Sequence, residues 1–195
     1  KIINKYVDLM IVVFPFEVDF YEREGITAEF VGHPLVKRID DFLIKNEKTN
    51  SDKIRISILP GSRKDEIDRM LPVLLETGNK FLKEFDCEIN ILCSPNFSET
   101  YYRSFLKDFN FNLIYDKDNS DLNYFTILNS DLVITKSGTS TIECALIGTP
   151  FCVVYRTGKL NYEIGKRLIR IKNIAMVNIL SGKEIVKEFL QEEVN

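Results

Sequence analysis

Short apolar runs alternate with longer amphipathic stretches along this chain, and that alternation constrains the fold more than any other feature. Leu9–Val13, Asp131–Ile134 and Phe151–Tyr155 show little of the polar alternation of a half-exposed strand. Strands that are apolar on both faces are typical of a parallel sheet covered by helices on each side. Strand and helix alternating at this spacing predicts an α/β fold, a doubly wound Rossmann-like parallel sheet.

The expected elements follow this alternation from one end of the chain to the other. We expect strands at 9–13, 28–31, 54–59, 88–92, 111–115, 131–134 and 151–155. We expect helices at 16–24, 35–44, 64–85, 98–109, 122–128 and 139–147, with most of the remainder helical. Pro72 should kink or break the long helix.

Both ends of the chain suggest a piece of a longer protein. Lys1 stands in what reads as the tail of a helix, and the charged segment 183–195 has no helix stop signal. The polar stretch Lys45–Lys53, rich in Asn and Lys, suits a linker or a surface loop.

Composition restricts the kinds of partner that this chain is expected to bind. The 195 residues are 45% hydrophobic and carry a net charge of −3, which argues against nucleic acid as a partner. No apolar run reaches the ~20 residues of a membrane span, so we expect a soluble or at most peripheral protein. Cys87, Cys93, Cys144 and Cys152 form no C-x-x-C pair, and His33 is the only histidine. We therefore expect buried, reduced thiols in a reducing cytoplasm and no metal site.

The first candidate binding turn is Leu59–Arg63, because ligands of open α/β sheets bind at the carboxyl ends of the strands. Gly61 allows a ligand close to the backbone, and Ser62 can cap the following helix. Arg63 opposes the helix dipole there and so calls for a nearby anion. A plain turn with a solvated arginine is the alternative.

The second candidate turn follows the strand 131–134. Ser137, Gly138, Thr139 and Ser140 would present backbone N–H groups and hydroxyls, which suits a diphosphate. Glu143, one turn into the helix, could accept hydrogen bonds from two ribose hydroxyls. The alternative is a capping box formed by Ser140 and Glu143. Neither a G-x-G-x-x-G fingerprint nor a P-loop is present.

Other polar residues have a structural and a functional interpretation. Arg156 follows the strand 151–155 and would lie over the same edge, or simply face solvent. His33 suits turn packing better than a substrate contact, and Glu17 can favour a helix dipole. A basic amphipathic stretch is more typical of a solvated helix face than of a contact with an anionic membrane surface. Its charged residues are Lys166, Arg167, Arg170 and Lys172.

The ordered set of motifs resembles the lipid-A-disaccharide synthase family across nearly the whole chain. The matching segments are Phe14–Glu17, Phe30–Leu35, Leu59–Ile67, Lys136–Glu143, Pro150–Arg156, Asn178–Gly182 and Val186–Gln191. The resemblance implies a GT-B glycosyltransferase, with two Rossmann-like domains facing a cleft and no metal or other cofactor.

The resemblance also implies a reaction. Such enzymes transfer 2,3-diacylglucosamine from its UDP donor to 2,3-diacylglucosamine 1-phosphate, giving lipid A disaccharide 1-phosphate and UDP. This chain would be the donor-binding half, inactive alone. The expected domains are 1–50, a segment joining the two domains; 51–182, the UDP-sugar-binding domain; and 183–195, the start of a truncated C-terminal helix. The expected location is the cytoplasm, with peripheral attachment to the inner membrane as an option.

By position, the resemblance assigns the UDP-sugar contacts to residues in the candidate turns and after them. They are Gly61, Ser62, Arg63, Ser137, Gly138, Thr139, Ser140, Glu143, Arg156, Asn178 and Gln191. The catalytic base is unknown and is expected in the N-terminal domain, a partner that this chain lacks. Three alternatives remain: UDP-N-acetylglucosamine 2-epimerase, a peptidoglycan N-acetylglucosamine transferase, and a non-catalytic nucleotide-binding module or inert fragment.

Overall fold

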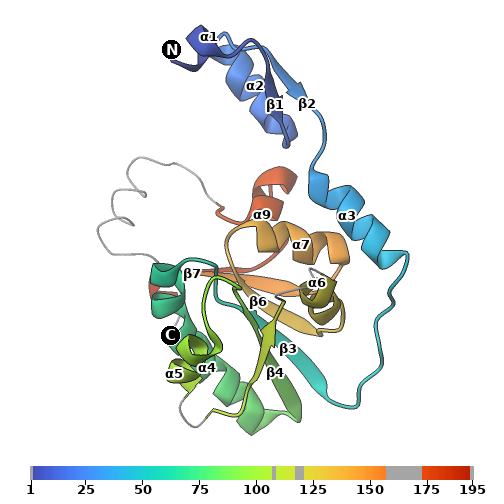
Figure 1. The fold of residues 1–195 in the computed structure, drawn as a ribbon, viewed down its shortest axis with the longest axis vertical. Helices are drawn as coiled ribbons and strands as arrows, with labels where there is room; N and C mark the ends of the chain where they lie inside the picture. The colour runs from blue at the N-terminus through green and yellow to red at the C-terminus, as the bar shows by residue number, and fades with distance from the viewer. Residues whose placement is uncertain (1, 107–108, 117–120, 157–172, 194–195) are drawn as a thin grey trace. The chain divides into compact units, whose positions relative to one another are not determined.

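A computed structural model describes residues 2–106, 109–116, 121–156 and 173–193 of the chain (Figure 1). The chain divides into two compact units, Lys1–Lys45 and Asn46–Asn195. Each unit is considered by itself below.

The first unit alternates short helices with two strands. Its elements are α1 (Ile3–Tyr6), β1 (Met10–Val12), α2 (Pro15–Arg23), β2 (Ala28–Phe30) and α3 (Pro34–Leu43). The two strands pair in parallel, with Met10 opposite Ala28. Both α2 and α3 begin with a proline, whose missing N–H costs nothing in the first turn of a helix.

His33 has the structural role in this unit. It is the N-cap of α3, and its Nδ1 accepts a hydrogen bond of 3.2 Å from the backbone N–H of Leu35. Its ring centroid lies 5.3 Å from that of Phe14. Glu17 also serves a helix start, because its Oε2 accepts the N–H of Phe14 at the beginning of α2.

The second unit is built on a six-stranded parallel sheet. Its strands are β3 (Ile54–Leu59), β4 (Cys87–Cys93), β5 (Asn112–Tyr115), β6 (Leu132–Lys136), β7 (Phe151–Tyr155) and β8 (Glu188–Leu190), in the order β5-β4-β3-β6-β7-β8. Its helices are α4 (Lys64–Glu84), α5 (Glu99–Leu106), α6 (Asp121–Leu128), α7 (Thr139–Ile147), α9 (Met176–Ser181) and the 3-10 turn η1 (Gln191–Glu193). The predicted doubly wound, Rossmann-like α/β fold is confirmed.

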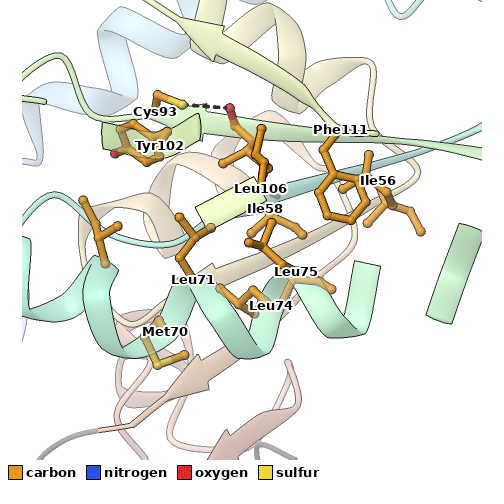
Figure 2. Packing of buried hydrophobic residues seen from close by; sticks show 14 of the residues in the cluster. Ile56, Ile58, Met70, Leu71, Leu74, Leu75, Cys93, Tyr102, Leu106 and Phe111 are labelled. Atoms are coloured by element: carbon orange, nitrogen blue, oxygen red, sulfur yellow. Dashed lines mark hydrogen bonds between the residues drawn. The ribbon is translucent and has the colours of Figure 1, made fainter. Parts of the chain in front are cut away.

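The largest hydrophobic cluster lies between the sheet and α4. Leu71, Leu74 and Leu75 project from α4 toward Ile56 and Ile58 of β3 (Figure 2). All five side chains are at most 2% exposed. The spacing of the helix residues places them on one face, and the alternate strand residues lie on the face of the sheet that meets it.

Neighbouring strand residues are buried on the opposite face. Val153 packs with Ala175 and Val177 at the start of α9, whereas Val154 belongs to the cluster beneath α4. Ser57, between the two isoleucines of β3, makes a buried hydrogen bond of 2.7 Å with the hydroxyl of Ser130. Burial on both faces accounts for the apolar strands in the sequence.

The chain reverses its direction of travel across the sheet between β3 and β6. It proceeds from β3 to β4 and β5 on one side, then returns as β6 on the other side of β3. Leu59 pairs with Thr135, so the two strands end side by side. Ligands of doubly wound sheets bind at such a switch point, beyond the carboxyl ends of the strands.

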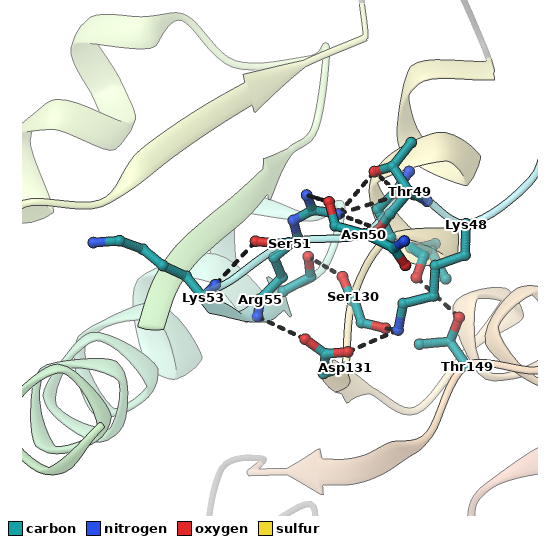
Figure 3. Close-up of polar contacts among 12 residues, drawn as sticks. Lys48, Thr49, Asn50, Ser51, Lys53, Arg55, Ser130, Asp131 and Thr149 are labelled. Carbon is teal, nitrogen blue, oxygen red and sulfur yellow. Dashed lines mark hydrogen bonds and ion pairs between the residues drawn. The ribbon is translucent and has the colours of Figure 1, made fainter. Parts of the chain in front are cut away.

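A network of hydrogen bonds and ion pairs lies at the amino-terminal ends of β3 and β6 (Figure 3). Asn129 Oδ1 accepts the backbone N–H of Thr49 at 2.7 Å, and Asp131 Oδ2 accepts the N–H of Arg55 at 2.9 Å. Lys48 Nζ lies 2.7 Å from Asp131 Oδ1. The backbone hydrogen bond from Arg55, followed by the hydrogen bond from Lys48, lowers the pKa of Asp131. The network fastens the start of this unit to the amino-terminal edge of its sheet.

The cysteines are free thiols, as predicted. Cys87, Cys93 and Cys144 are buried, and Cys152 is half-buried. Burial raises the pKa of the Cys93 and Cys144 thiols to about 12. Among the described helices, none is both long enough and apolar enough to cross a membrane.

One secondary-structure prediction was wrong. Residues 183–195 were expected to begin a helix, but they contain β8 and η1. Pairing with β7 and the hydrogen bonds that the buried Glu188 carboxylate accepts outweigh the local helix propensity there. Of the kink or break expected at Pro72, the break does not occur, because α4 continues through this residue as one helix. The proline is exposed, and the helix loses one backbone hydrogen bond while its apolar face stays packed on the sheet.

Leu74→Ala is expected to lower the free energy of unfolding by about 2–5 kcal/mol, because it leaves a cavity between α4 and the sheet. Leu122→Ala is the control, since Leu122 is 37% exposed at the start of α6 and should cost less than about 1 kcal/mol. Urea unfolding monitored by circular dichroism measures both. Equal losses would contradict the assignment of the core.

Candidate functional site

Four neighbouring strands end at one edge of the sheet, and each is followed by a predicted site residue. The register of β3, β6, β7 and β8 sets Leu59 beside Thr135, Lys136 beside Val154, and Tyr155 beside Leu190. The segments that follow these ends are 60–63, 137–140, Arg156 and Gln191. The structure thus brings both candidate turns to the same edge, at the switch point.

The turn between β3 and α4 is held open by Gly61. Its φ is +118°, a conformation that residues with a Cβ rarely adopt. Ser62 and Arg63 are exposed beyond it. Ser62 was expected to cap α4, but the N-cap is Arg63, whose side chain makes no capping hydrogen bond. The Arg63 guanidinium is 83% exposed and lies 3.7 Å from Glu66 Oε1.

The turn between β6 and α7 uses its hydroxyls to hold itself in place. Ser140 Oγ lies 2.7 Å from Thr135 Oγ1, and Thr141 Oγ1 donates to Gly138 O at 2.8 Å. Ser137 Oγ donates to Ile174 O at 2.7 Å, which ties the turn to the segment before α9. These inward-facing hydroxyls hold the turn, and the exposed residues Gly138 and Thr139 lie at the helix start, where the first backbone N–H groups have no partner within the helix.

The capping box proposed for this turn does not form. α7 begins at Thr139 with Gly138 as its N-cap, so Ser140 is already inside the helix. Glu143 is half-buried in the second turn of α7, and its Oε1 accepts a hydrogen bond of 3.4 Å from the hydroxyl of Tyr124 on α6. Glu143 therefore serves no capping role here.

An ion pair joins the two turns. Lys136, the last residue of β6, donates to Glu66 in the first turn of α4, with 3.0 Å between Nζ and Oε1. Burial raises the pKa of Glu66, but the bond to Lys136 and the backbone amides of Ser62 and Arg63 outweigh it, so the net pKa is lowered. The carboxylate stays charged beside the turn at neutral pH.

Lys136 and Glu66 lie in this site although they are absent from the predicted site residues. Lys136 gives a signal of its own, because a charged residue closes an apolar strand just before a glycine turn. The sequence signal of Glu66 is weaker, because acidic residues are common in the first turn of a helix, where they interact favourably with the helix dipole. Only the pairing of β3 with β6 brings the two together.

Asn178 lies in α9 and is fully buried. Its Oδ1 accepts the backbone N–H groups of Ile185 and Val186 at 2.8 and 3.0 Å. Its Nδ2 donates to Val186 O at 2.9 Å and to Glu188 Oε1 at 2.7 Å. The carboxamide thus makes four hydrogen bonds within the protein.

Glu188, a buried carboxylate on β8, fixes the segment to which Ser137 is bound. Its Oε2 accepts the N–H of Ile174 at 2.9 Å, and its Oε1 accepts the N–H of Ala175 at 3.0 Å. Hydrogen bonds therefore run from the β6–α7 turn through residues 174–175 to β8. Its signal in the sequence is weak, because it is one of two adjacent charged residues between short apolar runs.

Arg156 and Gln191 complete the edge. Arg156 is exposed after β7. Gln191 follows β8 with φ of 53°, the only positive φ of a non-glycine residue in the described ranges. Such a conformation is strained, and strained residues are concentrated at functional sites. The basic residues Lys166, Arg167, Arg170 and Lys172 lie outside the described residues.

No three acidic, histidine or cysteine side chains are arranged to hold a metal ion in the part of the chain that the structure describes. The charged groups that the edge does present are Arg63, Lys136, Glu66 and Arg156. With the backbone N–H groups at the start of α7, this edge can accommodate an anionic ligand.

The six-stranded parallel sheet, with polar turns at its switch point, defines a Rossmann-like α/β domain. The sequence model of the lipid-A-disaccharide synthetase family matches residues 1–195. The chain belongs to that family.

Individual relatives agree with the family assignment. The chain is 35% identical to the lipid-A-disaccharide synthase of Geobacter sulfurreducens, over 100% of this chain and 52% of the relative. It is 36% identical to the synthase of Nitrosococcus oceani, over 99% of this chain and 51% of the relative. The synthase of Persephonella marina is 33% identical, over 99% and 54%. The chain spans about half the length of the curated relatives it matches.

Gly61→Ala is expected to lower the free energy of unfolding by about 3 kcal/mol, because a Cβ there would lie 2.8 Å from Glu66 Oε2 and φ is unfavourable. Gly148→Ala is the matched control. Gly148 also has a positive φ, +83°, but its Cβ would meet nothing within 4 Å, so only about 1 kcal/mol is expected. Equal losses in urea unfolding would show that Glu66 does not fill the turn.

Glu188→Gln should cost about 1–3 kcal/mol of stability, since the Gln NH2 group would face an N–H donor and leave a buried group unsatisfied. Glu184→Gln, an exposed change on the same segment, is the control and should be nearly neutral. Amide hydrogen exchange at Ile174 and Ala175 should accelerate only in the Glu188 variant. Unchanged exchange at both amides would contradict the anchoring role.

Proposed function

We propose that this chain is the donor-binding half of a lipid-A-disaccharide synthase. The enzyme would transfer 2,3-diacylglucosamine from its UDP donor to 2,3-diacylglucosamine 1-phosphate, with release of UDP. Family membership supports the reaction. The observation that carries the binding role is the meeting of the β3–α4 and β6–α7 turns at the switch point of the sheet.

The diphosphate of the donor would lie against these two turns. Transfer builds negative charge on the leaving UDP, and fixed donors and cations at that position lower the barrier. Arg63 can approach a phosphate because its guanidinium is exposed. Gly138 and Thr139 are exposed residues at the start of α7, where the first turn supplies N–H groups and the positive end of a helix dipole. Gly61, Ser62, Ser137 and Ser140 would shape or line the same pocket.

The nucleoside and sugar would be held by residues farther along the edge. The Glu143 carboxylate can accept hydrogen bonds from two ribose hydroxyls in addition to the one from the Tyr124 hydroxyl. Arg156 and Gln191, after β7 and β8, would line the donor side of the cleft. Asn178 would hold its segment of the site in place and would not bind the ligand directly, because its side-chain polar atoms already make hydrogen bonds within the protein.

The remaining assignments rest on the relatives' greater length. A base must accept the proton of the acceptor 6-hydroxyl, and we assign it to an N-terminal domain outside this chain. The first unit, Lys1–Lys45, would join the two domains, and the second unit, Asn46–Asn195, whose sheet includes β8, would form the donor-binding domain. The protein would work in the cytoplasm, where its acylated substrates favour peripheral contact with the inner membrane.

Calorimetry with UDP tests the binding role. The chain should release heat on binding UDP, and Arg63→Ala should weaken binding about tenfold or more through loss of a charged hydrogen bond. Arg103→Ala is the control, because Arg103 is an exposed arginine on α5 paired with Glu99. No heat with the unaltered chain would remove the donor site and favour an inert domain.

The reaction itself is tested on the full-length protein that contains this chain. We expect it to consume acylated UDP-glucosamine with the acylated 1-phosphate acceptor and to leave UDP-N-acetylglucosamine unused. Turnover of the non-acylated donor would instead indicate an epimerase or a peptidoglycan transferase. Binding of UDP without turnover of either donor would indicate a nucleotide-binding module.

A further inference from the structure

Lys136 stands between the two glycine turns of the proposed donor site. Its side chain is 21% exposed at the end of an apolar strand. Its Cδ would lie 3.4 Å from a Cβ on Gly61, and its Nζ would lie 3.7 Å from a Cβ on Gly138. The stem therefore passes one turn, and the ammonium, with its three N–H donors, lies beside the other.

Glu66 is the ion-pair partner of that ammonium. Its Oε1 accepts from Lys136 at 3.0 Å, and its carboxylate lies against Gly61. The backbone amides of Ser62 and Arg63 favour its charge. Oε2 is nevertheless buried without a well-formed hydrogen bond to any described residue. An internal carboxylate thus occupies a position built from a cation, amides and a glycine turn.

These surroundings are the ones a phosphate requires. A phosphate group brings more charge and more acceptor oxygens than a carboxylate, so it competes for the same donors. The Lys136–Glu66 ion pair is weak enough for a phosphate to compete with it. Both side chains are about one fifth exposed, so solvent screens the attraction between them.

We infer that Lys136 is a further binding residue for the diphosphate of the donor, and that Glu66 is the anion that positions its ammonium before the diphosphate binds. The inference rests on the proposed donor site and adds to it a cation absent from the motif-based assignment. On binding, Lys136 exchanges one Glu66 oxygen for a phosphate oxygen. Arg63 and Lys136 then face the diphosphate from the two turns.

Calorimetric titration of the chain with UDP tests Lys136. Lys136→Met should weaken UDP binding about tenfold, whereas Lys136→Arg, which keeps the charge, should stay within about threefold. The matched control is Lys48→Met, which removes a lysine from an ion pair at the opposite end of β6 and changes the net charge equally. Thermal melting without UDP establishes that each variant is folded.

Glu66→Gln tests the positioning anion. It keeps the shape of the side chain but removes the charge that competes with the diphosphate, so UDP should bind about threefold more tightly at low ionic strength. Weaker binding in this variant, or equal effects of Lys136→Met and Lys48→Met, would overturn the inference. If the unaltered chain fails to bind UDP, the donor site and this inference fall together. If it binds UDP and Lys136→Met changes nothing, only the inference falls.

Discussion

Parallel pairing of β3 with β6 is the constraint on which the rest of this molecule depends. Because these strands run in the same direction with Leu59 beside Thr135, the two turns that follow them emerge side by side. Their helices begin at the same edge, and both leave backbone N–H groups without partners in the helix. Burial of apolar side chains on both faces of the sheet fixes this geometry, so the core sets where polar chemistry can occur.

Charged and hydroxyl side chains at this edge pair with groups of the protein itself. Glu66 and Lys136 neutralise one another across the two turns, while the hydroxyls of Ser137 and Ser140 face inward and hold their loop. Glu188 extends this order to the start of α9. Glu66 and Glu188, which need not touch a ligand, therefore help to hold the residues that would bind one, and such support makes a binding surface preorganised.

The sequence predicted much of the fold because its signals are local. Apolar runs located the strands, and Gly61 and Gly138 located both turns. β8 was missed because its pairing with β7 joins Val153 to Glu188, residues distant in sequence. The contact of Lys136 with Glu66 spans 70 positions and was invisible for the same reason. The internal hydrogen bonds of Asn178 depend on the path by which residues 185–188 come back beside it, and no sequence motif predicts that path.

The buried cysteines of this fold can serve as probes of its local and global unfolding. A thiol reacts as its thiolate, and a pKa of about 12 leaves Cys93 and Cys144 almost wholly protonated at neutral pH. Cys93 belongs to the cluster beneath α4, whereas Cys144 lies within α7. An alkylating reagent should therefore modify either thiol only when its own helix layer separates from the strands, so that the rates of modification distinguish local from global unfolding.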